Sequence, residues 1–444
     1  MRMTTPIADF IRRYAAGDPA RLHVPGHKGR GPLGIEAWDI TEICGADSLY
    51  EAAGIIAESE RNASELFGTA ATLYSTEGSS HCIRAMMKLC LERFSGPGRP
   101  LVLAARNAHK AFLYAAALLD LDVEWLYPEG PGSLCACPIA PERLEEALKG
   151  CGTKPICAYF TSPDYLGGQQ DLRALSAVCR RYGVPMAVDN AHGAYLRFLP
   201  GDAHPMELGA DLCCDSAHKT LPVLTGGAYL HVSKNAWPGC AENAKAALSL
   251  FGSTSPSYLI LASMDEANAR LAERGREDYA RTAARIADLK DLLRARGFAV
   301  SETEPLKLTL RTDGRAMARR LREGGVECEY ADEGHLVMMF SPGNREEDPD
   351  RLVGALGEPL PYAPGEERGA AAAPRRMTIR EAVLAPCEWV EARRSVGRVC
   401  ASPAVSCPPA VPIAVSGEEI TPEAAELFVR YGTERVQVVR REHT

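Results

Sequence analysis

The 444-residue chain contains no CxxC pair, although it has 15 cysteines. Structural zinc sites need paired clusters of ligands. Neither the CxC of Cys135 and Cys137 nor the adjacent Cys213 and Cys214 has a second half nearby. The odd cysteine count, scattered through apolar segments, predicts reduced core or loop thiols in the cytoplasm. We predict no metal site.

The sequence also lacks an apolar run long enough to cross a membrane. Its longest strongly apolar stretch, Ala111 to Leu119, is interrupted by Asp120 and Asp122, whereas a spanning helix needs about 20 residues. The first twenty residues have no apolar core followed by a small-residue cleavage site, so we predict no secretory signal. A membrane is therefore not an expected partner.

An excess of basic residues is absent as well. Lys and Arg number 50 against 58 for Asp and Glu, which gives a formal net charge of −8. Global attraction to nucleic acid is therefore not expected. The 46% of apolar and 24% of charged residues are typical of a compact globular protein, and the length suits two to three domains.

Between about Ile55 and Val232, helical patterns alternate with short apolar runs, as in βα units around a mostly parallel sheet. The pattern becomes mainly helical after Phe251, with strand-like segments at Lys307–Leu310 and Leu336–Phe340 that indicate a smaller α+β domain. A stretch rich in Pro, Gly and Ala then predicts a linker. The expected parts are an N-terminal segment (1–54), a large cofactor-binding domain (55–250), a small α+β domain (251–357), the linker (358–376) and a C-terminal segment (377–444).

Four segments place reactive polar residues after apolar strands, where open α/β sheets bind ligands. They are TEGSSH (76–81), ARNAHK (105–110), VDNAHG (188–193) and DSAHKT (215–220). Alone, each has an ordinary explanation: a serine helix cap, a buried aspartate that anchors a loop, or a solvated surface lysine.

Together the four segments indicate pyridoxal phosphate. Gly78, Ser79 and Ser80 would bind a phosphate at a helix N-terminus. Lys219 would form the Schiff base, and Asp189 would keep the pyridine nitrogen protonated so that the ring withdraws electrons. His109 would stack on the ring.

The same segments carry a family resemblance. LHVPGHKG, ARNAHKA, VDNAHGAYL, GADLCCDSAHKTLPVLTGGAYLHV and STSPSYLILASMD resemble the Orn/Lys/Arg decarboxylases in their short bacterial form. The resemblance continues into MTIREAVLAP and PPAVPIAVSGEEIT near the C-terminus. It implies an α/β fold of the aspartate aminotransferase-like kind, fold type I of the pyridoxal phosphate enzymes. The expected architecture is a large domain with a mainly parallel sheet, a small α+β domain and an appended C-terminal segment.

The resemblance supports Lys219, Asp189 and His109 in the roles given above. It adds cofactor-side residues that match motif positions, namely Ser79, Ser80, Ser216 and His218 near the phosphate, Ala191 on the ring face opposite His109, and His192 near the cofactor. It also implies a homodimer or larger homo-oligomer with interfacial active sites, in which Ser255 and Ser257 reach the partner's cofactor.

Several neighbours depart from the family pattern, so cofactor binding is better supported than the substrate. The departures are Tyr50, Ala52, Glu77, Asp164, Asn190 and Gly226. A substrate with a second cation needs a distal acidic partner, for which Glu51, Glu77 and Asp164 are unranked candidates.

The predicted function is decarboxylation of lysine, ornithine or arginine to a diamine or agmatine and carbon dioxide, within polyamine biosynthesis. Transamination or elimination at the same cofactor is one alternative. A cofactor-binding protein with little catalysis is another. A remote third is a metal hydrolase that uses His23, His27, Asp189 and His192, although Pro25 and Gly26 favour a turn there.

Overall fold

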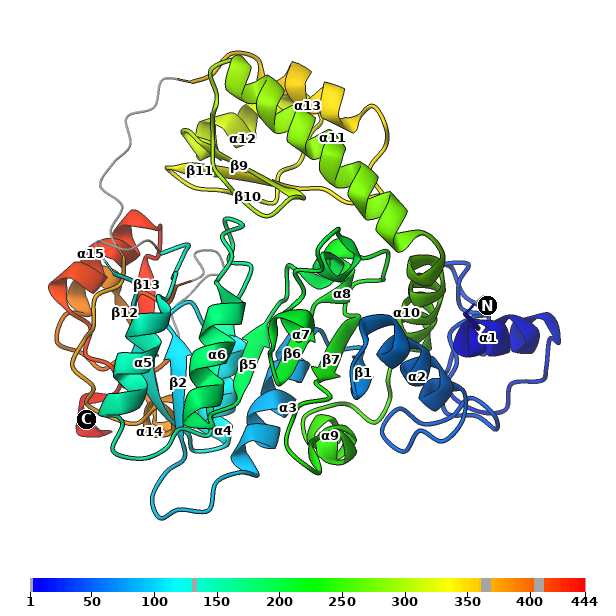
Figure 1. Ribbon diagram of the computed structural model, residues 1–444, viewed down its shortest axis with the longest axis horizontal. Coiled ribbons are helices and arrows are strands. Elements are labelled where there is room, and N and C mark those ends of the chain that lie inside the picture. The colour runs from blue at the N-terminus through cyan, green and yellow to red at the C-terminus, as the bar shows by residue number, and fades with distance from the viewer. Residues whose placement is uncertain (1–2, 130–133, 361–368, 403–410, 444) are drawn as a thin grey trace. The chain divides into compact units, whose positions relative to one another are not determined.

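The computed structural model describes residues 3–129, 134–360, 369–402 and 411–443 (Figure 1). The chain divides into two compact units, Met1–Arg93 with Pro185–Ala280, and Phe94–Val184 with Arg281–Thr444. The domain boundaries expected from the sequence stay a prediction.

The first unit contains four strands in the order β1-β7-β6-β5. Strand β7 is antiparallel to both β1 and β6, whereas β5 and β6 are parallel. The strands are β1 (Ala71–Ser75), β5 (Met186–Asp189), β6 (Leu212–Asp215) and β7 (Ala228–Val232). Almost every residue in them is buried, because helices cover them.

Helix α3 packs against all four of these strands, and α9 packs on α3 (Figure 1). Helix α1 contacts α2 and α10. The helices of this unit are α1 (Pro6–Ala16), α2 (Ile55–Phe67), α3 (Ser79–Leu91), α7 (Pro205–Leu208), α8 (Ala217–Thr220), α9 (Cys240–Ser249) and α10 (Tyr258–Arg270), with a 3-10 turn η1 (Ala194–Phe198) and a π-helical turn η2 (Leu271–Gly275). Helix α11 (Arg276–Ala295) contains the boundary to the second unit.

The second unit contains three parallel strands in the order β4-β2-β3. They are β2 (Leu101–Ala105), β3 (Asp122–Leu126) and β4 (Cys157–Thr161), and helices α4 (Lys110–Leu118), α5 (Pro141–Gly150) and α6 (Leu172–Tyr182) alternate with them. Neighbouring residues fix both ends of α6. The Asp171 side chain caps its first turn, and Gly183 ends the helix with a backbone in the left-handed region. With β5 and β6, these strands confirm the expected mainly parallel arrangement.

A second sheet has the antiparallel order β10-β11-β9-β8. Helices α12 and α13 lie together on one side of it (Figure 1). Its elements are β8 (Ala299–Val300), β9 (Lys307–Arg311), α12 (Gly314–Glu323), β10 (Tyr330–Ala331), β11 (His335–Met339) and α13 (Asp348–Leu356).

The C-terminal segment contains more structure than the one helix expected from its sequence. A capping box of Thr378 and Glu381 starts α14, and an antiparallel pair, β12-β13, packs near it. The elements are α14 (Ile379–Leu384), β12 (Cys387–Glu391), η3 (Ala392–Arg394), α15 (Pro422–Arg430), β13 (Arg435–Val439) and η4 (Arg441–His443).

Candidate active site

The start of α3 has the geometry of a phosphate site. Gly78 precedes the helix with φ +73°, a conformation that favours glycine, and its N–H donates to the carbonyl of Gly226 at 2.7 Å. The hydroxyls of Ser216 and Ser79 lie 2.7 Å apart. Two hydroxyls beside the N–H groups of a 13-residue helix suit a phosphate group.

Asp189 is the last residue of β5 and is 2% exposed. Its Oδ1 accepts from the Ala191 N–H at 3.1 Å and from the Cys214 thiol at 3.7 Å. The parallel ladder places it opposite Cys214 of β6. A buried carboxylate at a strand end suits a cationic ring nitrogen, because burial of a charge needs a charged or hydrogen-bonding partner.

Lys219 is the third residue of the short helix α8, which directly follows β6. It is exposed, and its Nζ lies 2.8 Å from Nε2 of the buried His192. The loops after β5 and β6 therefore bring together two residues predicted separately as cofactor contacts. His218, beside Lys219, directs Nδ1 to the Gly227 carbonyl at 3.0 Å.

His109 belongs to the second unit, unlike the other predicted cofactor residues. It caps α4, where its Nδ1 accepts from the Ala111 N–H at 3.2 Å. Its stacking role stays a prediction.

Behind the two strand ends lies a buried network that the sequence did not reveal. Asp215 accepts from the Asn190 amide at 2.7 Å through Oδ1, and its Oδ2 lies 3.0 Å from Nε2 of both His204 and His231. Nδ1 of His204 accepts from the Met206 N–H at 3.3 Å, which leaves the proton on Nε2. Burial opposes the charge of Asp215, but the two histidines hold the pKa of its carboxyl well below the usual range.

The chain matches the Orn/Lys/Arg decarboxylase major domain over residues 5–312. It is 28% identical to the uncharacterized protein YaaO of Bacillus subtilis, with 96% of this chain and 94% of that protein covered. It is 29% identical to an arginine decarboxylase of the same organism, with 94% and 92% covered. The solved constitutive lysine decarboxylase of Escherichia coli has a TM-score of 0.79 at 18% identity, with 99% of this chain and 82% of that chain covered.

The chain belongs to the Orn/Lys/Arg decarboxylase family. Members of this family are amino-acid decarboxylases that depend on pyridoxal phosphate, so the expected enzyme class and cofactor are confirmed. The structural similarity confirms the fold-type-I architecture. No described helix is both long and apolar enough to span a membrane.

The residues of this family member fit the cofactor. The serine hydroxyls at the start of α3 suit the phosphate, the buried Asp189 suits a pyridinium, and the exposed Lys219 amine suits a carbonyl. The side-chain amide of Asn107, two residues before His109, is 2% exposed, and neither of its polar atoms has a hydrogen-bond partner among the described residues. Such a buried group needs a hydrogen-bond partner, and a bound ligand could supply one.

The three acidic candidates for substrate recognition differ in their burial and in their hydrogen-bond partners. Asp164 is 7% exposed and accepts from the Gly168 N–H at 2.8 Å, so it anchors its own turn. Burial raises its pKa to about 6, against the influence of that N–H and of Lys307. Glu77 and Glu51 are exposed, and Glu77 accepts from the Ser253 N–H at 2.6 Å.

Two other departures from the family pattern have local packing reasons. Gly226 has φ +102°, and a Cβ there would lie 2.8 Å from the Thr76 carbonyl oxygen, so no larger residue fits. A Cβ on Gly252 would meet the Tyr50 hydroxyl at 1.7 Å, so these two residues pack in direct contact. Burial and the charge of Glu77 raise the pKa of Tyr50 to about 12.

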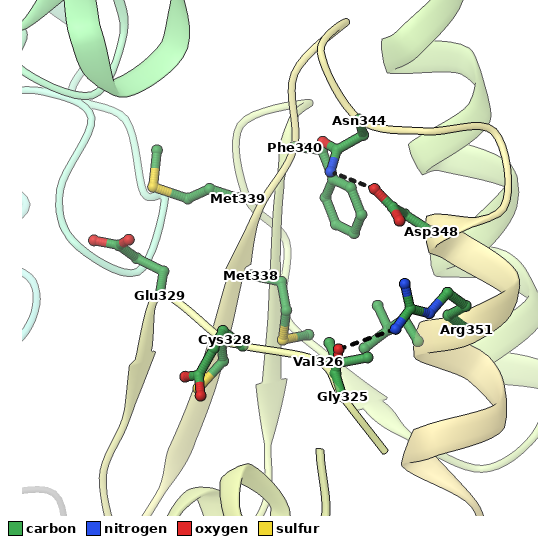
Figure 2. A pocket seen from close by; sticks show the side chains of 12 residues that line it. Gly325, Val326, Cys328, Glu329, Met338, Met339, Phe340, Asn344, Asp348 and Arg351 are labelled. Atoms are coloured by element: carbon green, nitrogen blue, oxygen red, sulfur yellow. Dashed lines mark hydrogen bonds between the residues drawn. The ribbon is translucent and has the colours of Figure 1, made fainter. Parts of the chain in front are cut away.

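A cavity of about 420 Å³ lies between β11, α13 and the segment before β10 (Figure 2). No predicted site residue lines it. Its carboxylates have partners within the fold: Asn344 for Asp348, Arg322 for Glu327 and Tyr165 for Glu329. The cavity therefore gives no sign of a second active site.

The metal-hydrolase alternative gains no support from the structure. His23 and His27 lie in turns, where their partners are the Tyr14 hydroxyl at 2.6 Å and Asp39 at 3.1 Å. Among the described residues, the cluster with suitable ligand spacing is His204, Asp215 and His231, whose hydrogen bonds are given above.

Proposed function

We propose that this enzyme decarboxylates a basic amino acid and that arginine is the first substrate to test. The observation that carries the proposal is the 2.8 Å contact between Lys219 Nζ and His192 Nε2, next to the strand that ends in Asp189. Arginine is placed first because the Bacillus subtilis relative named arginine decarboxylase aligns over 94% of this chain.

Each residue has a distinct task in the proposed reaction. Pyridoxal phosphate, when bound, supplies an electron sink for the charge that develops at Cα as the carboxylate leaves. Asp189 holds a proton on the pyridine nitrogen, and Lys219 binds the cofactor between turnovers. His192 is within reach to exchange a proton with the Lys219 amine. Ser79, Ser80, Ser216 and His218 hold the phosphate beside the turn at Gly78, and Ala191 and His109 flank the ring.

Glu77 is the better of the two exposed candidates for the distal cation of the substrate. It lies directly before the phosphate-binding turn, and its contact with the Ser253 N–H fixes its carboxylate. Glu51, by contrast, accepts from the hydroxyl of Ser48, which lies three residues before it in an exposed stretch.

A test of the reaction uses the purified enzyme with its visible cofactor band recorded first. Arginine, lysine and ornithine are then supplied separately, and products are identified by mass spectrometry. We expect one substrate to lose carbon dioxide and yield agmatine or a diamine. A keto acid would instead indicate transamination, and a cofactor band with no product from any substrate would contradict the proposal. Lys219→Ala is the negative control.

We also propose a homodimer in a reducing compartment such as the cytoplasm. Large apolar side chains are exposed along residues 22–38 at 46 to 94%: Leu22, Val24, Leu33, Ile35 and Trp38. Exposed apolar patches of this kind mark protein interfaces, and all described cysteines are free thiols. Sedimentation of the holoenzyme should give twice the chain mass, and Leu33→Glu with Trp38→Glu should shift it toward the monomer. A wild-type monomer would contradict the dimer.

A further inference from the structure

The C-terminal segment makes a buried ion pair with the segment that carries His109. Arg106 follows β2 and is 1% exposed, and its two Nη atoms donate to the two carboxylate oxygens of Glu418, both at 2.8 Å. The guanidinium carbon lies 5.1 Å from the Trp125 ring centroid and 5.7 Å from that of Tyr127. This bidentate ion pair fixes the orientation of the two side chains as well as the distance between them.

The C-terminal backbone holds Glu418 in place. Its Oε2 also accepts from the Val415 N–H at 2.8 Å, and its carbonyl accepts from the Cys400 N–H at 2.9 Å. Glu418 is 6% exposed. Loss of either charge would leave the other buried and unpaired, which is strongly unfavourable.

A second contact reaches the far end of the same segment. Arg380 of α14 donates to the carbonyls of Ala117 at 2.9 Å and Leu118 at 3.1 Å. These carbonyls belong to the last turn of α4, where the carbonyl groups of a helix have no N–H partners within the helix itself. Since His109 caps the first turn of α4, the C-terminal segment contacts the chain on both sides of this histidine.

We propose that the described part of the C-terminal segment is a positioning element of the active site, in which Glu418 and Arg380 fix the 106–118 segment that carries His109 and Asn107. The inference rests on the proposed role of His109. It assigns to the C-terminal segment a task in cofactor retention, with Glu418 as a positioning residue.

The test compares two neighbouring glutamates in the full-length holoenzyme. Glu418→Gln removes the buried charge with little change of shape. Glu419→Gln is the matched control, because Glu419 pairs with Arg376 on the surface at 2.8 Å. The measured quantity is the rate at which bound cofactor is lost after dilution, followed by its visible absorbance and circular dichroism.

We expect Glu418→Gln to lose cofactor about tenfold faster or more, with an altered circular dichroism band, while Glu419→Gln stays within about twofold of wild type. His109→Ala should show the same defect, and the double variant should lose cofactor no faster than His109→Ala alone. That non-additivity separates positioning of His109 from a general loss of stability. Because cofactor loss is measured without substrate, the result is independent of which amino acid is decarboxylated.

Arg380→Ala provides a second test if Glu418→Gln does not fold, since Arg380 is only partly buried and its removal leaves no buried charge without a partner. We expect it to speed cofactor loss in the same direction, whereas Arg394→Ala on the surface should not. Wild-type cofactor retention in Glu418→Gln or, should that variant not fold, in Arg380→Ala would overturn the inference. The inference would also be overturned if the double variant lost cofactor faster than His109→Ala by the full effect of the second substitution. Normal cofactor retention by His109→Ala itself would overturn it as well.

Discussion

The side-chain amide of Asn190 donates to Oδ1 of Asp215 at 2.7 Å. Asn190 directly follows Asp189 at the end of β5, and Asp215 is the last residue of β6. The Asn190 N–H also donates to the Cys214 carbonyl at 2.9 Å. These two bonds extend the β5·β6 ladder past its end. They join the residue after Asp189 to the segment that leads to Lys219.

Asn190→Asp should destabilise the enzyme by about 3 kcal/mol, because it would place a second carboxylate against the buried Asp215. The measurement is the free energy of unfolding in denaturant at neutral pH. Asn344→Asp is a matched control, since Asn344 also donates to an aspartate, Asp348 at 3.2 Å, but on the surface. Equal effects of the two substitutions would argue against a buried charged network.

Lys219→Ala should abolish turnover and the covalent attachment of cofactor. Reduction of the wild-type holoenzyme with borohydride, followed by peptide mass analysis, should place the label on Lys219. Lys110→Ala tests the rival lysine next to His109 and should keep both the label and most of the activity. Labelling at Lys110 or Lys28 would refute the assignment.

Asp189→Asn should lower kcat by about a hundredfold or more while the fold is retained, because a neutral amide no longer favours the protonated pyridine nitrogen. The substrate KM should change less, since the proposed partner of Asp189 is the pyridine nitrogen and not the substrate. Steady-state kinetics on the accepted amino acid provide the measurement. An unchanged kcat would exclude this role for Asp189.

Asp265→Asn should flatten the pH dependence of stability. Asp265 is 1% exposed and accepts from the N–H groups of Ile7 and Ala8 and from the Ser59 hydroxyl. Burial raises its pKa from 3.8 to about 6. The stability from its protonated form is therefore full below pH 3.8 and is lost as the pH rises through about 6.

That loss amounts to about 3 kcal/mol for the wild type, and asparagine, which does not titrate, should avoid it. Asn at this position can accept from the two N–H groups and donate to Ser59, so the network survives. Unfolding in denaturant at several pH values from about 4 to 7 is the measurement. A variant with the same pH slope as the wild type would contradict the raised pKa.

Local sequence was enough to predict the elements that carry the chemistry. The apolar run before Asp189 became β5, the run before Asp215 became β6, and the glycine and serines after the first strand became the start of α3. Each is decided by neighbouring residues, because strand burial and helix capping depend on a few adjacent side chains. The family motifs then indicated which strand-end residues contact the cofactor.

Contacts between residues far apart in the sequence could not be predicted from local patterns. Arg106 and Glu418 are 312 positions apart, and His231 meets Asp215 from a strand 16 positions away. Neither pair lies at a helical or strand spacing, so no periodic pattern marks it. The local sequence around Asp164 likewise does not show that its carboxylate is buried and accepts from the Gly168 N–H.

By itself, the sequence determined the family, the cofactor and the order of strands and helices, since these depend on motifs and on local hydrophobic patterns. Only the tertiary structure decided which charges are buried together: Asn190 with Asp215, and Arg106 with Glu418. The physical reason is that a buried charge requires a partner in space, and the chain's folding, not its local pattern, brings that partner within reach.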